Sequence, residues 1–191
     1  GSAYPNSRLR FTGIQARIDS QSIFPLLDGA TMVLECSDST ESKFIVNDFS
    51  VARRIPYIYA GVVGTTGQLL VYSPQTGARA SCLRCLFGDF TENDINSQTA
   101  TCRQAGIAGP VAGQVGILQG SFAVAAILNR LDLNRSQLWR LTRFGAAAAV
   151  TDIEPAADCP LGCGIDRLTV LDLRARTCPS TFVYTKLALE Q

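Results

Sequence analysis

Two close pairs of cysteines, far apart in the sequence, constrain the fold of this chain most strongly. Two residues separate Cys82 from Cys85, and three separate Cys159 from Cys163. Zinc prefers a tetrahedron of soft ligands, and each short spacing lets one turn of chain supply two of them. The spacing therefore predicts a structural site of four thiolates that ties two distant parts of one domain together. Four thiolates leave no open position for water.

Two short disulfides, or free thiols, are the other interpretation of these pairs. The chain has seven cysteines, an odd number, and its opening segment GSAYPNSRLR lacks the apolar core of a signal peptide. Together with the close spacings, these features favour a reducing compartment, so we expect a cytoplasmic protein. A third interpretation, that the chain is a disulfide-bonded secreted module, is supported by the cysteine count alone.

Composition excludes several classes of function. The net charge is +1, which gives no electrostatic reason to expect a nucleic-acid partner. Charged residues make up 17% of the chain, against about 25% in typical domains, which hints at surface covered by a partner. Because there is no histidine, catalysis by His–Cys or Ser–His pairs is excluded. At 191 residues the chain is one domain, or one domain and a piece.

The order of the apolar segments predicts a doubly wound α/β sheet. Residues 8–18 alternate like a strand with a bulge at Gly13, and the apolar run 31–36 suits a central parallel strand in which Cys36 is a small buried hydrophobe. A helix capped by Asp38 or Ser39 follows and is closed off by Pro56. Two strands, 57–63 and 68–73, then flank a tight turn.

Residues 104–129 contain no charged side chain and are long enough to suggest a membrane span. Pro110 and the glycines within this stretch favour instead a short loop followed by a core helix to about Leu131, so no membrane association is expected. Gly113, Gly116 and Gly120 would give that helix a face for close packing. Residues 137–153 are predicted to form two more strands, with Ala146 to Ala149 at or near their junction.

The segments GVVGTTGQLLVYSP and TCRQAGIAGPVAGQVGILQG, together with the cysteine pairs, resemble the second half of the ThiF/MoeB family. These bacterial relatives of ubiquitin-activating enzymes adenylate the C-terminus of a small sulfur-carrier protein. The resemblance covers roughly residues 6–165 and implies that residues 1–165 form the C-terminal half of a Rossmann-like domain. The family's glycine-rich, nucleotide-binding first half has no counterpart here, so we expect a fragment of a longer protein; the alternative is that another chain supplies that half.

The resemblance assigns a role to Asp38. In ECSDST this residue matches the second acidic residue of the family's Asp-Cys-Thr-Asp-Asn motif, which is implied to coordinate the magnesium of bound ATP. This sequence has Glu35 where the family has aspartate, Ser39 where it has asparagine, and Lys43 where it has arginine, while Asn47 is kept. From the residues alone, Asp38 is equally well explained as a helix cap.

Two further cysteines are candidate catalytic residues. Cys102 precedes the AGIAGP segment, where the family's reactive cysteine is implied in sulfur transfer or in a covalent link to the carrier. Cys178 and Pro179 are predicted to open a helix, whose N-terminus favours a thiolate. Residues 166–191 resemble the start of a TusA-like sulfur-relay domain, although Thr181 replaces the second proline of its motif and the domain is incomplete.

The implied function is ATP-dependent adenylation of a ubiquitin-like sulfur carrier ending in Gly-Gly, followed by sulfur transfer, in cofactor biosynthesis of the thiamine or molybdopterin type. The implied cofactors are structural zinc and, in the complete enzyme, ATP with magnesium. The implied partners are the carrier, a cysteine desulfurase or other persulfide donor, and a second copy in a homodimer. The alternative is a non-catalytic, zinc-stapled pseudoenzyme that binds a carrier protein or a partner subunit.

Overall fold

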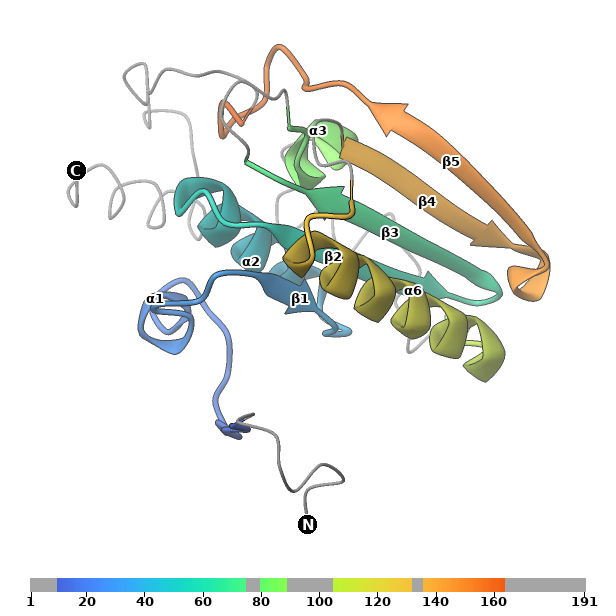
Figure 1. Ribbon diagram of the computed structural model, residues 1–191, viewed down its shortest axis with the longest axis horizontal. Coiled ribbons are helices and arrows are strands. Elements are labelled where there is room, and N and C mark those ends of the chain that lie inside the picture. The colour runs from blue at the N-terminus through green and yellow to red at the C-terminus, as the bar shows by residue number, and fades with distance from the viewer. Residues whose placement is uncertain (1–9, 75–79, 89–104, 132–135, 164–191) are drawn as a thin grey trace.

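One mixed, five-stranded sheet organises the part of the chain that the computed structural model describes, residues 10–74, 80–88, 105–131 and 136–163 (Figure 1). The strands lie in sequence order, β1-β2-β3-β4-β5. The first pair, β1 with β2, is parallel, and every later pair is antiparallel. The strands are β1 (Val33–Glu35), β2 (Tyr57–Val63), β3 (Thr66–Tyr72), β4 (Ser136–Thr142) and β5 (Ala147–Ile153).

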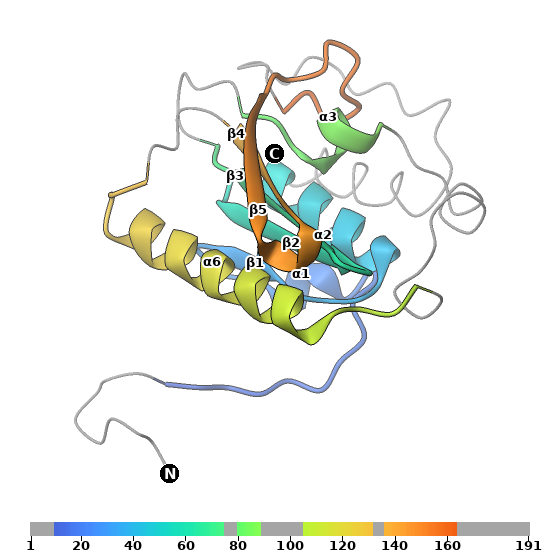
Figure 2. The same cartoon turned by 90° about the vertical axis from the view of Figure 1, so that its right-hand side faces the viewer.

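Helices cover both faces of this sheet, with α2 (Thr40–Ala52) on one side and α6 (Gly109–Ile127) on the other (Figure 2). Successive residues of a strand point to opposite faces. Accordingly Tyr57 and Tyr59 of β2 join the core beneath α2, while Ile58 packs against α6. Two short helices, α1 (Ile23–Leu26) and α3 (Leu83–Phe87), complete the described helices, together with the 3-10 turn Arg143–Gly145. This confirms the predicted α/β, Rossmann-like class.

The β1–α2–β2 unit forms as the sequence predicts. Ser39, not Asp38, caps α2, because its hydroxyl accepts a hydrogen bond of 3.2 Å from the Ser42 backbone N–H. Ile45 and Phe49 are buried on the helix face that meets the sheet, and the helix ends at Ala52, before Pro56. Asp38 is thereby left exposed in the turn between β1 and α2.

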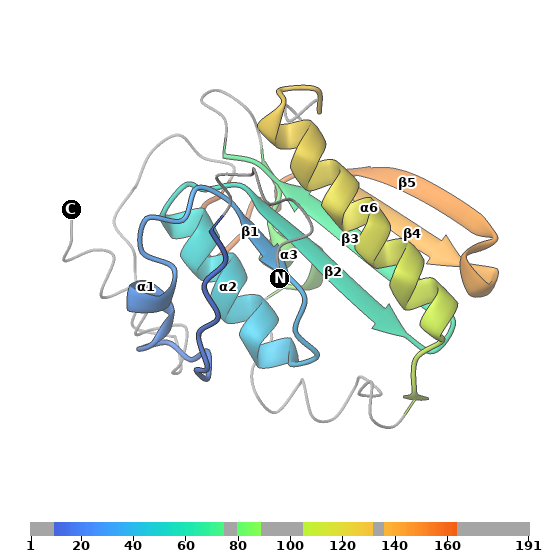
Figure 3. The same ribbon diagram turned by 60° about the horizontal axis from the view of Figure 1, so that its bottom comes forward.

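Helix α6 runs obliquely across β2 and β3 (Figure 3). Its inner face buries Val111, Val115 and Ala123 against the sheet. Length and composition alone would let α6 cross a membrane, a test that core helices of globular domains also pass. In the part of the chain that the structure describes, the expected close packing of its glycines is not found, since a Cβ added at Gly113, Gly116 or Gly120 would meet no atom within 4 Å. Val111, Val115, Gln119 and Ala123 face the sheet, so these glycines lie toward the outer side of the helix, with Ile117 and Val124.

Other predictions also need correction. Residues 10–18 form no strand, because no described strand lies beside them to complete a hydrogen-bond ladder. Phe11 and Ile14 of this segment are 88% and 63% exposed.

The predicted central position of residues 31–36 is also corrected, since β1 lies at an edge of the described part of the sheet. By contrast, the two strands predicted for residues 137–153 are confirmed as β4 and β5, and Ala146 to Ala149 directly follow their junction, the turn Arg143–Gly145. The strand and helix predicted beyond residue 166 lie outside the described residues.

The contact between β3 and α6 depends on the absence of a side chain at Gly67. A Cβ there would lie 2.4 Å from Val115 Cγ2 and 3.3 Å from Val111 Cγ1. We expect Gly67→Ala to lower the free energy of unfolding by about 1–3 kcal/mol, because the helix must shift away from the strand. Urea titration followed by circular dichroism measures this loss.

The matched control for Gly67→Ala is Gly120→Ala, on the outer face of α6, where the added methyl group meets nothing. It should raise stability by up to about 1 kcal/mol through helix propensity. Equal effects of the two substitutions would show that α6 does not pack on β3 as closely as described.

Candidate functional site

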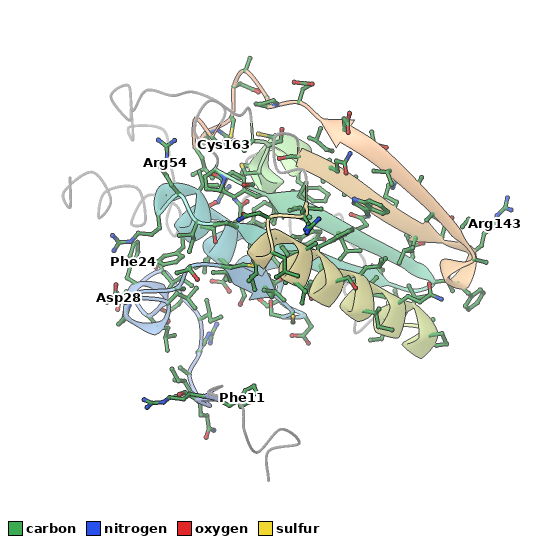
Figure 4. All side chains as sticks on the ribbon, viewed as in Figure 1. Phe11, Phe24, Asp28, Arg54, Arg143 and Cys163 are labelled. Carbon is green, nitrogen blue, oxygen red and sulfur yellow. The ribbon has the colours of Figure 1, made fainter. Side chains whose placement is uncertain are left out.

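The four cysteines of the two close pairs meet in space, as their spacing predicts. Their sulfur atoms all lie within 4.8 Å of one another. Cys82 Sγ lies 4.0 Å from Cys85 Sγ and 3.7 Å from Cys159 Sγ, while Cys163 Sγ lies 3.2 Å from Cys85 Sγ and 3.5 Å from Cys159 Sγ. Figure 4 shows Cys163 beside α3, among the sulfur atoms of this cluster.

These distances fit a tetrahedral metal site. Four sulfurs at zinc–sulfur distances of about 2.3 Å lie about 3.8 Å apart at the corners of a tetrahedron, and the sulfur separations scatter around that value. Cys82 is fully buried and the other three are half-buried. The four thiols, called here the four-cysteine cluster, can therefore hold a metal ion. The described cysteines form no disulfide.

The thiols of the cluster differ in how readily they ionise. Hydrogen bonds from Cys159 and the other thiols hold the pKa of Cys85 far below its usual range, and a hydrogen bond with Cys163 lowers the pKa of Cys159 to about 7. Hydrogen bonds with Cys159 raise the pKa of Cys82 and of Cys163, and burial adds to both shifts. Ionising all four would gather four negative charges, half of which a divalent cation would offset.

The first cysteine pair is positioned by α2. The Arg84 guanidinium, between the two cysteines, donates from Nε to Asp48 Oδ1 at 2.8 Å and from a terminal nitrogen to Asp48 Oδ2 at 2.6 Å. Both side chains are at most 4% exposed. Asn47 accepts a 2.9 Å hydrogen bond from the Leu83 backbone N–H. These bonds fix the orientation of α3, and with it the thiols of Cys82 and Cys85.

The sheet brings the second cysteine pair to the first. Ser81 donates its hydroxyl to the Ile153 carbonyl at 2.7 Å, which joins the chain just before α3 to the end of β5. Its backbone N–H donates to Ser136 Oγ at 2.7 Å. Six residues after β5, a turn follows in which the Gly162 N–H donates to the Cys159 carbonyl and Gly162 has φ of 57°. This turn directs Cys159 and Cys163 to the same point.

Asp38 lies at the carboxyl end of β1, where the turn is held from beneath by Glu35. The buried Glu35 carboxylate accepts hydrogen bonds from the backbone N–H of Ser37 at 2.7 Å, from the Ser37 hydroxyl and from the Lys43 ammonium. Lys43 also donates to the Ala60 carbonyl at 2.7 Å. The Glu35 carboxylate thus already accepts hydrogen bonds from Ser37 and Lys43. Asp38 is the carboxylate of this turn that faces solvent. Carboxylate oxygen is a suitable ligand for magnesium.

The interpretation of Cys36 as a buried hydrophobe is wrong, since the residue is exposed just beyond the end of β1. Its thiol donates to Gln119 Oε1 at 3.2 Å. Gln119, buried in α6, donates in turn to the carbonyls of Glu35 at 2.8 Å and Ile58 at 2.9 Å. The glutamine therefore joins α6 to both parallel strands.

The two candidate catalytic cysteines, Cys102 and Cys178, lie outside the described residues, so their position relative to Asp38 stays a prediction. Sequence reasoning missed two structural groups, the Asp48–Arg84 pair and Gln119. A signal existed for both. Arg84 is a charged residue in the otherwise apolar segment CLRCLF, and Gln119 falls on the inner face of an uncharged helix. Buried polar groups of this kind need specific partners.

Comparison with known proteins finds relatives over most of this chain. The model of the ThiF family matches residues 4–161. The sulfur carrier protein ThiS adenylyltransferase of Escherichia coli is 30% identical over 159 residues, covering 83% of this chain. The adenylyltransferase and sulfurtransferase UBA4 of Yarrowia lipolytica is 32% identical over 119 residues, covering 62% of this chain.

Among solved structures, Escherichia coli MccB with ATP matches 80% of this chain with a TM-score of 0.58 and 21% identity, a similarity that concerns the fold alone. The matched regions make up 60% of the E. coli ThiS adenylyltransferase, 28% of the Yarrowia protein and 45% of the MccB chain. The chain therefore spans less than two thirds of the length of each of these proteins.

The Asp48–Arg84 pair gives a test of how the cluster is positioned. We expect Arg84→Met to lower the free energy of unfolding by about 3–5 kcal/mol, because it leaves the Asp48 carboxylate buried without its cation. Adding Asp48→Asn should recover part of that loss. Urea titration of the single and double variants measures both effects.

Arg140→Met serves as the control, because Arg140 is exposed on β4. It should change stability by no more than about 0.5 kcal/mol. If Arg84→Met cost no more than Arg140→Met, the buried ion pair would not be what fixes α3.

Proposed function

Because the chain belongs to the ThiF family, we propose that it is part of an ATP-dependent adenylyltransferase that activates the C-terminus of a ubiquitin-like sulfur-carrier protein. Relatives over most of its length are named sulfur carrier protein ThiS adenylyltransferase and molybdopterin-synthase adenylyltransferase. In this reaction a carboxylate oxygen of the carrier's terminal glycine attacks the α-phosphorus of ATP, and pyrophosphate leaves. The product is an acyl-adenylate, in cofactor biosynthesis of the thiamine or molybdopterin type.

The position of Asp38 carries this proposal. Ligands of open α/β sheets bind beyond the carboxyl ends of the strands, and Asp38 is exposed at the carboxyl end of the parallel strand β1. Its carboxylate would hold the magnesium ion that accompanies ATP, which offsets phosphate charge. Glu35 and Lys43 support the backbone of the turn from the buried side. The nucleotide's phosphates would be contacted mainly by a part of the domain that this chain does not span.

Sulfur transfer is the second step of the proposed function. A persulfide supplied by a cysteine desulfurase or another donor carries a nucleophilic sulfur, which attacks the carbonyl carbon of the adenylate as AMP leaves. We propose Cys102 as one relay point and Cys178 as another, with residues 1–165 forming the activating part and residues 166–191 the start of a TusA-like segment. The same proposal includes a homodimer located in the cytoplasm.

We propose zinc as the metal of the four-cysteine cluster, since four thiolates suit zinc and leave no open position. The chain purified without chelators should contain one zinc per protomer by native mass spectrometry. Cys82→Ser and Cys163→Ser should lose the metal and unfold at lower temperature, because the metal links α3 to the turn after β5.

The matched control is Cys36→Ser, which removes a thiol outside the cluster and should keep one zinc. A metal-free wild-type mass lowered by pairs of hydrogens would mean disulfides instead, and would contradict the zinc assignment.

The adenylation proposal is tested on a fused protein, in which the part of the E. coli ThiS adenylyltransferase that precedes its matched region is followed by this chain. Carrier-dependent exchange between ATP and pyrophosphate should appear in the fused protein, while calorimetry should detect no tight ATP binding by this chain alone. Asp38→Asn should lower the exchange at least about 100-fold, because the metal loses a ligand.

Asp28→Asn is the matched control, since Asp28 is an exposed aspartate beside α1 (Figure 4), away from the carboxyl end of β1. It should leave the exchange unchanged. A folded fused protein without exchange, or one in which Asp38→Asn has no effect, would favour the alternative of a non-catalytic scaffold that binds a carrier or partner subunit.

A further inference from the structure

A buried ion pair closes the turn between β1 and α2 from beneath. Glu35 is the last residue of β1, and Lys43 lies near the start of α2, so the two flank the turn of residues 36–39 that contains Asp38. The Lys43 ammonium donates to the Glu35 carboxylate, and the two side chains are only 12% and 2% exposed. An ion pair this deeply buried is tolerated only when the remaining hydrogen bonds of both groups are made.

Both oxygens of the Glu35 carboxylate are engaged within the turn. Oε1 accepts from the Ser37 backbone N–H at 2.7 Å and from the Ser37 hydroxyl, while Oε2 accepts from Lys43. A carboxylate can only accept hydrogen bonds when ionised, and each oxygen has few lone pairs to offer. Because the ammonium also offsets its charge, Glu35 does not compete for a cation. A metal at this turn is therefore left to the exposed Asp38 carboxylate.

Lys43 also acts at the point where β1 leaves the sheet. The last register pair between the parallel strands joins Glu35 to Tyr59, whereas β2 continues to Val63. The Lys43 ammonium donates to the Ala60 carbonyl at 2.7 Å, one residue beyond that last pair. A main-chain acceptor needs a partner when it is removed from water. The lysine supplies that partner, which allows the chain to turn away from β2 after Glu35.

The lysine itself is held from several sides. Its backbone N–H donates to the Ser39 carbonyl at 3.1 Å, and its carbonyl accepts from the Tyr57 hydroxyl at 3.4 Å. The ammonium lies 5.2 Å from the centre of the Tyr59 ring, within the range of a cation–π contact. That ring lies across Gly61, where an added Cβ would stand 2.5 Å from the Tyr59 hydroxyl oxygen. The position of the ammonium is thus determined by β2 and by the start of α2.

We propose that Lys43 is a positioning residue for the metal of magnesium–ATP, acting through Glu35 on the turn that carries Asp38. The ammonium holds the Glu35 carboxylate, and that carboxylate holds the Ser37 N–H one residue before Asp38. The Asp38 carboxylate is thereby presented at a fixed point beyond β1. This inference rests on the proposed function, in which Asp38 ligates magnesium. It adds that two side chains that do not touch the metal set the affinity for magnesium.

The lengths of the two side chains provide a test by loss and rescue. Glu35→Asp draws the carboxylate back by one methylene group, and Lys43→Arg places a longer and planar cation in the same space. Each change alone should break the contact with Ser37 or with Ala60. Together they move one methylene group from the acid to the base and should restore the pair. Recovery in the double variant is the sign that the two residues act as one unit.

The measurement is calorimetric binding of ATP to the fused protein defined above, over a range of magnesium concentrations. Glu35→Asp and Lys43→Arg should each raise the magnesium concentration for half-maximal ATP binding by at least about 10-fold, because a small displacement of a ligand is costly. The double variant should return to within about 3-fold of the unchanged protein. At saturating magnesium the ATP affinity of each single variant should recover, which a general loss of structure would not allow.

The matched control is Asp48→Asn, which alters the acid of the other buried ion pair of α2, a pair made with Arg84. It should lower the unfolding temperature and leave the half-maximal magnesium concentration unchanged. If Asp48→Asn raised that concentration as much as Glu35→Asp does, destabilisation would be the cause and the proposal would be overturned. Additive losses in the Glu35→Asp/Lys43→Arg double variant would overturn it as well.

Hydrogen exchange of the chain alone tests the same pair without ATP. Glu35→Asp should speed exchange of the Ser37 amide by at least about 10-fold, and adding Lys43→Arg should slow it again. An unchanged rate, or a rate that does not recover, contradicts the proposal even if the fused protein does not fold. A fused protein with the expected magnesium shifts but no ATP–pyrophosphate exchange would support the role of Lys43 and contradict the proposed function. A folded fused protein that binds no ATP would contradict both.

Discussion

A buried ion pair joins α2, the helix that follows Asp38, to α3, the helix that carries the first cysteine pair. Arg84 lies between Cys82 and Cys85, and its guanidinium makes a two-point contact with Asp48 of α2. The first turn of the same helix follows directly after Asp38. Removing two charges from water is costly, and the cost is offset only when geometry is good and the remaining hydrogen bonds are made. The pair therefore fixes the angle between α2 and α3 rather than simply adding stability.

The four-cysteine cluster extends this constraint to the β5 edge of the sheet, because its second cysteine pair follows β5. A metal bound by both cysteine pairs would close a loop of chain that includes α6 and β4. Closing a long loop restricts the unfolded chain more than the folded one. A bound metal would thus stabilise the folded arrangement of α6, β4 and β5, which lie between the two cysteine pairs, while α2 sets the position of the first two thiols.

Sequence reasoning succeeded where a residue pattern strongly favours one local arrangement. The spacing of the cysteines led to the cluster, and the paired strands around GTTG led to the β2–β3 hairpin. It failed where the answer depends on neighbours that a sequence does not reveal. Asp38 and Ser39 are equally good caps by type, and only the phase of α2 selects Ser39. Residues 10–18 have a strand pattern, but the described chain offers no strand beside them.

The sequence also could not show which side of α6 carries its glycines. Both stripes of this helix are uncharged, so periodicity alone cannot tell the inner face from the outer one. The buried Gln119 settles it, since its amide reaches the carbonyls of two strands and accepts from the Cys36 thiol.

The Gln119 amide also fixes the position of α6 on the sheet. A slide of the helix by one residue, or a rotation about its axis, would leave the glutamine and two strand carbonyls without partners in a buried setting, at a cost of about 1–3 kcal/mol for each group. The helix is thus held in one place while its outer side chains face away from the sheet. A rigid surface loses little conformational entropy when a partner covers it. The hydrogen bonds of Gln119 therefore hold the exposed apolar face of α6 in a fixed position, which lowers the entropic cost of association at that face.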